Sequence, residues 1–155
     1  MTTSKKSIIV NIISWLYAVL FLYTGIYKFI DHVLFKETMT KSALIRRFSG
    51  IIAITIPSLE LLIAFALLMP FFLYTPRTRK WGLYAGTALM TIFTIYVGYM
   101  LKFVPDLPCS CGGIISKMSW HQHLYFNSCF TALGLLAILL NTRQSEEKQN
   151  KLTFS

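Results

Sequence analysis

Two cysteines in the segment Pro105–Gly113 (PDLPCSCGG) have the clearest capacity for chemistry in this sequence. Cys109 and Cys111 are separated by a single serine, so their thiols are close enough to form a disulfide. A disulfide closed over one intervening residue has little freedom to reach relaxed torsions, and such strain makes the bond easier to reduce. We therefore interpret the pair as suited to thiol–disulfide exchange rather than to a permanent cross-link.

Two charged residues stand in apolar surroundings and form a second set of candidates, Glu60 and Lys28. A carboxyl group inside a bilayer costs several kcal/mol if it is charged and faces lipid, so Glu60 must face inward, either protonated or paired. Its alternative role is structural, as a neutral group hydrogen-bonded to a neighbouring helix. Lys28 either extends to the membrane surface or holds a negative charge near the cysteines. Residue counting places the two about 12 Å apart along the membrane normal, at about 1.5 Å per residue, so we expect no direct pair.

The helix that follows the cysteines carries a third set of candidates. His123 and Asn127 are four residues apart and therefore share one helix face, whereas His121 points away from them. His123 could stabilise a thiolate or relay its proton, or it could instead bond lipid headgroups or backbone at the interface. Cys129 lies deeper in the same helix, and we interpret it as a small buried hydrophobic residue rather than a second redox thiol.

Two alternative functions remain open from these residues. Thiolate, thioether and imidazole groups occur close together in the sequence, at Cys109, Cys111, Met118, His121 and His123. This mixture suits a soft metal such as Cu(I), although the spacing is not a standard zinc pattern. The other alternative is a structural subunit or a small-solute transporter that uses Glu60 as its proton site.

The composition of the chain indicates a membrane protein of one domain. Of its 155 residues, 55% are hydrophobic and only 14% are charged, and the mean hydropathy is +0.58. Four apolar runs, 8–30, 50–74, 81–104 and 120–141, are each long enough to cross roughly 30 Å of hydrocarbon. The first run is too long for a signal peptide and has no cleavage site. We predict an all-α, integral membrane four-helix bundle with the Cys-x-Cys loop between its third and fourth helices, and a disordered polar tail over 142–155.

Small and polar side chains predict which helix faces point inward. In the first span they recur at spacings of three and four, as Asn11, Ser14, Ala18, Phe21, Gly25 and Lys28. This stripe should face the bundle interior, because lipid offers polar groups no partner. Gly82 and Gly86 in the third span predict close helix packing, and we expect no functional site there. The connection 31–49 could form a short helix at the membrane interface.

The basic residues do not decide the membrane topology by number. The formal net charge is +9. One side of the proposed membrane carries eight of the fifteen Lys and Arg residues: Lys5, Lys6, Arg77, Arg79, Lys80, Arg143, Lys148 and Lys151. The other side carries seven: Lys28, Lys36, Lys41, Arg46, Arg47, Lys102 and Lys117. The short, basic second turn favours cytoplasmic termini and an external cysteine loop, in an oxidising compartment where a dithiol is useful. Charges that flank spans instead of forming one patch argue against nucleic-acid binding.

Several of these features together resemble the MauE branch of the DoxX-like membrane proteins. The likeness rests on the four-span layout, the segment Thr24–Phe29 (TGIYKF), the motif Pro57-x-x-Glu60-Leu61 and the loop motif Cys109-x-Cys111-Gly112. It extends to about Asn141. The resemblance implies a redox-associated, multi-pass protein of the bacterial inner membrane. MauE itself is linked to methylamine metabolism and to maturation of the disulfide-rich small subunit of methylamine dehydrogenase.

The resemblance suggests a specific function. The protein would relay electrons to or from an extracytoplasmic client or a thioredoxin-like protein, as a thiol–disulfide oxidoreductase or its membrane relay partner. Cys109 and Cys111 would be the catalytic residues, supported by His123, Asn127, Lys28 and Glu60. Bundles of similar shape, of the vitamin K epoxide reductase and DsbB types, pass electrons between thiols and a quinone. A quinone is therefore a candidate cofactor by analogy of fold alone.

Overall fold

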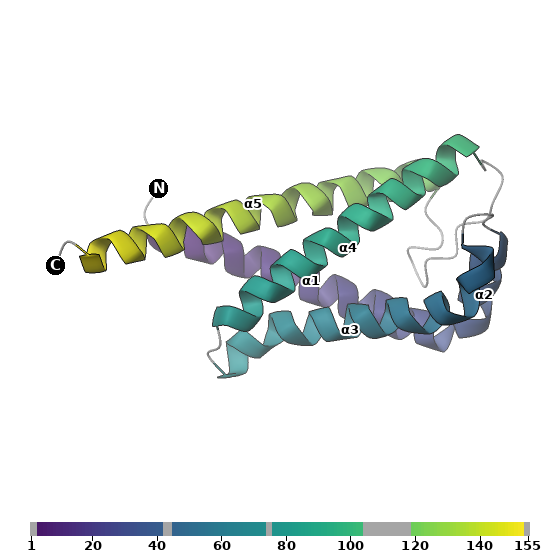
Figure 1. Cartoon of the computed structure of the whole chain (residues 1–155), viewed down its shortest axis with the longest axis horizontal. Helices are drawn as coiled ribbons and strands as arrows, with labels where there is room; N and C mark the ends of the chain where they lie inside the picture. The colour runs from purple at the N-terminus through teal and green to yellow at the C-terminus, as the bar shows by residue number, and fades with distance from the viewer. Residues whose placement is uncertain (1–2, 42–44, 74–75, 104–118, 154–155) are drawn as a thin grey trace.

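The described part of the protein is entirely helical. The computed structural model describes residues 3–41, 45–73, 76–103 and 119–153, and no strand occurs among them. In chain order the elements are α1 (Thr3–Ile30), α2 (His32–Lys41), the 3-10 helix η1 (Arg46–Phe48), α3 (Ser49–Leu73), α4 (Pro76–Phe103) and α5 (Trp120–Thr153) (Figure 1). The predicted all-α class is confirmed, whereas the Cys-x-Cys segment lies outside the described residues.

Four helical segments are long and apolar enough to cross a membrane: Lys5–Ile30, Arg46–Leu73, Arg77–Phe103 and Trp120–Thr142. They agree with the four predicted spans to within a few residues. Large apolar side chains such as Phe65, Leu62 and Ile95 point outward from them. Water would penalise an exposed apolar surface of this extent, whereas lipid tolerates it. The chain is therefore a multi-pass membrane protein, and both termini lie at the same end of the bundle (Figure 1).

Close contacts between the helices depend on small residues, as the sequence predicts. α1 packs against α3 and α5, and α4 packs against the same two helices. A Cβ atom added at Gly86 of α4 would lie 3.0 Å from the Tyr17 ring of α1, so a larger residue would force this ring to shift. The Tyr17 hydroxyl donates a 2.6 Å hydrogen bond to the carbonyl oxygen of Phe130 on α5. α1 is thus fixed within the bundle by both packing and a partly buried hydrogen bond.

A polar clamp joins three helices near the end of the bundle that carries the termini. Arg79 of α4 donates from Nη1 to Asn11 Oδ1 of α1 at 2.5 Å, and from Nη2 to Asn141 Oδ1 of α5 at 3.5 Å. The inward prediction for Asn11 is consistent with this contact. Its arginine partner was not predicted, because nothing in the local sequence distinguishes Arg79 from the exposed Arg77.

The predicted disordered tail is wrong for most of its length. α5 continues past the apolar segment, which ends at Thr142, to Thr153. The residues that follow Thr142 are mainly Arg, Gln, Glu and Lys, which have high intrinsic helix propensity. Because the preceding span already supplies the helix nucleus, each further residue adds at low entropic cost.

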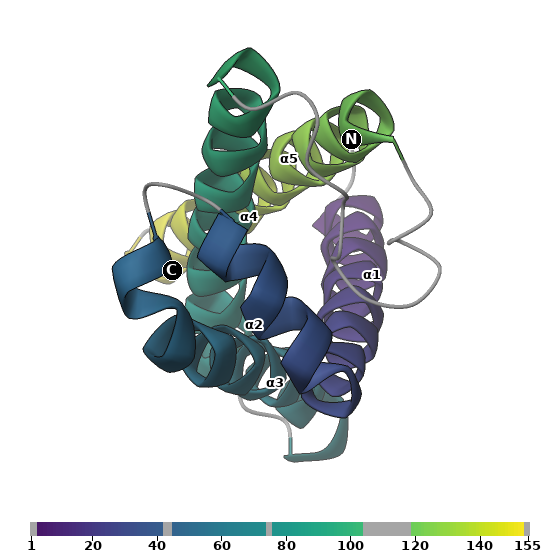
Figure 2. The same ribbon diagram turned by 90° about the vertical axis from the view of Figure 1, so that its right-hand side faces the viewer.

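The predicted short helix in the connection 31–49 is confirmed as α2, which η1 follows. α2 lies across the end of the bundle opposite the termini, in front of α3 (Figure 2). Its buried side chains Phe35 and Met39 pack against Ala53 of α3. α2 also covers the inward face at the end of α1, where the Lys28 ammonium group lies 5.6 Å from the Phe35 ring centroid.

Candidate functional site

A cavity of about 280 Å³ lies beneath α2 and is lined by residues from all five α-helices. Its walls are mainly apolar, and six of its residues are aromatic: Phe21, Phe35, Phe93, Tyr96, Trp120 and Phe126. Lys28, Glu60, His123 and Asn127 also line it. The cavity therefore brings together the four residues that the sequence predicts as supporting groups.

Lys28 and Glu60 form a direct ion pair inside this cavity. The Lys28 Nζ atom donates a hydrogen bond to Glu60 Oε1, and the two residues are only 6% and 1% exposed. The ammonium group also lies 5.0 Å from the ring centroid of Phe93 and 5.6 Å from that of Phe35, within cation–π range. The prediction that the two residues are too far apart for a direct pair is wrong.

The error has two physical causes. First, Phe35 of α2 covers the Lys28 ammonium group, so Lys28 is buried although it lies near the end of a span. A Cβ atom at Gly25, one turn earlier, would lie 3.3 Å from the carbonyl oxygen of Pro57, which precedes Glu60 by one turn. Second, side chains tilt toward the N-terminus of their own helix, and α1 and α3 are antiparallel. Lys28 therefore points away from the α2 end of the bundle and Glu60 points toward it, so the two side chains approach each other.

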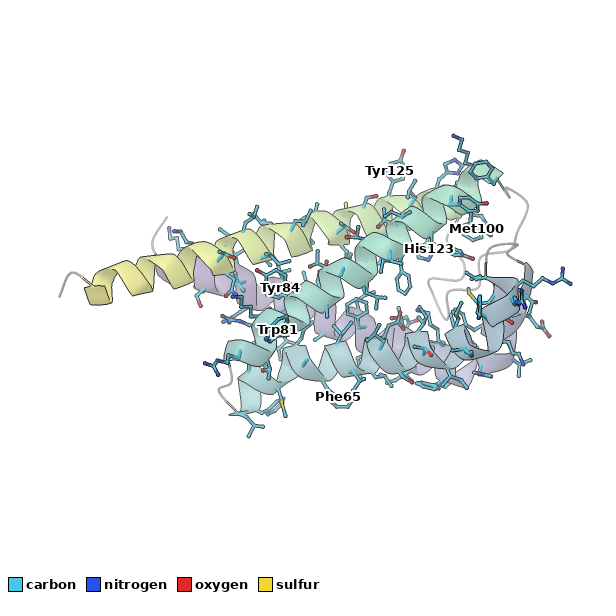
Figure 3. The ribbon with its side chains drawn as sticks, in the orientation of Figure 1. Phe65, Trp81, Tyr84, Met100, His123 and Tyr125 are labelled. Atoms are coloured by element: carbon cyan, nitrogen blue, oxygen red, sulfur yellow. The ribbon has the colours of Figure 1, made fainter. Side chains whose placement is uncertain are left out.

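His123 and Asn127 face the cavity from α5, as their spacing predicts. They are 7% and 2% exposed, whereas His121 is exposed on another face. Figure 3 shows His123 and Met100 near the α2 end of the bundle, whereas the Tyr125 side chain projects outward from the bundle. Neither imidazole nitrogen of His123 has a hydrogen-bond partner among the described residues, and neither does Asn127 Nδ2. His123 is thus a buried residue that lines the cavity.

The structure describes one of the three cysteines, Cys129. Cys109 and Cys111 lie outside the described residues, so their redox role stays a prediction. Cys129 is exposed on the surface of α5, and the expectation that it is buried is wrong. At about 100° per residue, Cys129 lies roughly 200° around the helix from Asn127 and so faces away from the cavity.

The soft-metal alternative gains little from the described residues. His121 and His123 lie on different faces of α5 and do not converge. No group of three or more His, Cys, Asp or Glu residues is close enough to hold a metal ion in the described part of the chain. Met118 and the Cys-x-Cys pair lie outside that part.

The sequence does not predict the contribution of α4 to the cavity. We expected no site in the third span, yet Met90, Phe93, Val97 and Met100 form one wall. Their spacing of three, four and three residues marks a single helix face. Such a stripe is the usual signature of a packed core, so the pattern cannot distinguish a cavity wall from ordinary packing.

The fold and the cavity together define a class: a four-span membrane bundle with an apolar chamber and a buried ion pair at its α2 end. Residues 6–140 match the model of the family described as methylamine utilisation protein MauE. Because this match covers most of the chain, the protein belongs to the MauE family. No curated protein and no solved structure gives a significant match.

Proposed function

We propose that the protein is an integral membrane thiol–disulfide redox protein whose Cys109–Cys111 pair exchanges electrons with an extracytoplasmic partner. The observation that carries this proposal is the Cys-x-Cys pair within the segment that matches the MauE family. In each exchange the dithiol of one protein becomes a disulfide while the disulfide of the other becomes a dithiol. Two electrons and two protons are transferred, so the step is balanced without a further reactant.

The positions of the helix ends support a link between the cysteines and the cavity. α4 ends at Phe103 and α5 begins at Trp120, so the segment that carries the cysteines is anchored at the α2 end of the bundle. His123 lies one turn into α5 and lines the cavity at this same end. Thiolate formation requires a proton acceptor, and an imidazole without a hydrogen-bond partner is suited to that role.

The family indicates the setting of this exchange. MauE is associated with methylamine utilisation, and we infer a role in maturing a disulfide-containing client of that process, such as the small subunit of methylamine dehydrogenase. We place the protein in the bacterial inner membrane, with cytoplasmic termini and with the cysteine segment on the periplasmic side. The partner is then the client itself or a thioredoxin-like protein.

Single-cysteine variants test the proposal directly. Cys109→Ala and Cys111→Ala each leave one thiol of the pair, which should retain the partner as a mixed disulfide that survives non-reducing electrophoresis. Cys129→Ala is the matched control and should trap nothing, because the intact pair resolves its own mixed disulfide. If neither single variant captures a protein and client maturation is unaffected by both changes, the proposal is wrong.

A further inference from the structure

We propose that the cavity binds the polar end of a lipid-soluble quinone, a planar ring with carbonyl or hydroxyl oxygens, which enters from the bilayer. Every residue that carries this inference lies on a described helix. The inference therefore does not depend on the role of Cys109 and Cys111.

The size of the cavity suits one substituted ring. Its volume of about 280 Å³ is nearly twice that of an engineered cavity of about 150 Å³ that binds benzene. Aromatic side chains from four different helices surround the space, including Phe21, Phe35, Phe93 and Phe126. Flat aromatic walls favour a planar occupant over a branched or flexible one, because ring pairs gain from offset or edge contacts.

The polar groups of the cavity favour a neutral ligand that carries oxygen. Asn127 Nδ2 and both nitrogens of His123 are buried without hydrogen-bond partners, and so is the second carboxyl oxygen of Glu60, Oε2. Each buried polar group left unpaired costs about 1–3 kcal/mol. Carbonyl oxygens of a quinone would accept from Asn127 and from the N–H of His123. Hydroxyl groups of the reduced form could donate to Glu60 or to the other imidazole nitrogen.

Other ligand classes fit these groups less well. A cation would meet the ammonium group of Lys28, and an anion would have to compete with the Glu60 carboxylate for that group. A bare acyl chain would fill the apolar volume but leave the amide and imidazole groups unpaired. The mixed set of donors and acceptors is matched by a ring whose oxygens can serve as either.

The cavity reaches the lipid-facing surface between α3 and α4. Ile92 of α4 lines it although its side chain is exposed, and Ile52 and Ile56 of α3 line it while half-buried. α4 diverges from α3 toward the end where α2 lies (Figure 1). An occupant can therefore enter sideways from the bilayer, which requires solubility in lipid and leaves room for an apolar tail.

Tryptophan fluorescence offers a direct test, because Trp120 lines the cavity. In the full chain with Trp15→Phe and Trp81→Phe, Trp120 is the only tryptophan and should be quenched saturably by decylubiquinone. A second chain with Trp15→Phe and Trp120→Phe reports from Trp81, which is exposed at the other end of the bundle. That chain should show only linear, collisional quenching. Decylbenzene has the ring and the tail without the oxygens, and it should compete at least 10-fold more weakly than the quinone.

Two pairs of variants locate the binding site. His123→Ala should weaken quinone binding about 10-fold, the order expected for loss of one buried hydrogen bond, whereas exposed His121→Ala should not. Ile56→Phe should narrow the mouth and weaken saturable quenching of Trp120, whereas Ile54→Phe, on the lipid face of the same helix, should not. Helical content by circular dichroism verifies that each variant folds. Equal binding of decylbenzene, equal quenching curves for Trp120 and Trp81, or saturation unchanged by Ile56→Phe would each overturn the proposal.

Discussion

Breaking the Lys28–Glu60 pair one residue at a time should destabilise the protein more than removing both residues together. The changes are Lys28→Met, which keeps the length of the apolar stem, and Glu60→Gln, which keeps the shape of the carboxyl group. Each single change leaves the other partner buried in an apolar cavity. The double variant leaves no charge there.

The magnitude follows from the burial of the pair. Both side chains are almost fully enclosed, so a charge left alone is expected to cost about 3–5 kcal/mol of unfolding free energy. Replacing a whole buried ion pair with neutral groups of similar volume is often close to neutral. We therefore expect the double variant to be more stable than either single variant, with a coupling energy of at least about 3 kcal/mol.

Reversible unfolding in mixed micelles, followed by tryptophan fluorescence or circular dichroism, gives the four free energies of this double-mutant cycle. The control is Lys36→Met, because Lys36 is exposed on α2 and its loss should change stability by less than about 0.5 kcal/mol. Single changes that cost less than about 1 kcal/mol, or costs that simply add in the double variant, would refute the buried pair.

Two further predictions use the same unfolding assay. Gly134→Ala should cost about 1–3 kcal/mol, because its Cβ atom would overlap the side-chain oxygens of Thr87 and Tyr17. Gly50→Ala should be neutral or slightly stabilising, since no atom lies within 4 Å of its added Cβ, and equal costs at both positions would contradict this packing. Arg79→Gln should cost about 1.5–3 kcal/mol through loss of its charged hydrogen bonds to α1 and α5. Exposed Arg77→Gln should change little, and an equal loss there would argue against the clamp.

The helices and their inward faces could be predicted because their signals are local. Four apolar runs of membrane-spanning length define four helices, whatever their partners. Residues such as Ser14, Ala18 and Lys28 share one face through the helical repeat alone, and all three are buried. The pairing of His123 with Asn127 on the inner face of α5 follows from the same geometry.

The relative depth of residues on different helices could not be predicted, because it depends on how far one helix slides along another. Residue counting assumed that α1 and α3 start from one plane at the α2 end, and it took no account of the opposite tilt of their side chains. The contact between Arg79 and Asn11 could not be predicted for the same reason, because the two residues lie on different helices and are remote in sequence. Cys129 was misplaced for a different reason: apolar character predicts burial in water but not in lipid, which accepts small apolar groups on either face.

The weakly apolar helix α2 determines the character of the site. Without it, the Lys28 ammonium group would lie close to the end of α1 and could extend to the membrane surface, as lysines near helix ends commonly do. Phe35 of α2 instead covers this group, and Thr38 and Met39 line the cavity beside it. Because the ammonium group is held away from water, its stable partner is a carboxylate, which explains why Glu60 is tolerated deep in α3. α2 is the helix with the least transmembrane character. It nevertheless encloses the ion pair and closes the apolar chamber that the unpartnered groups of α5 line.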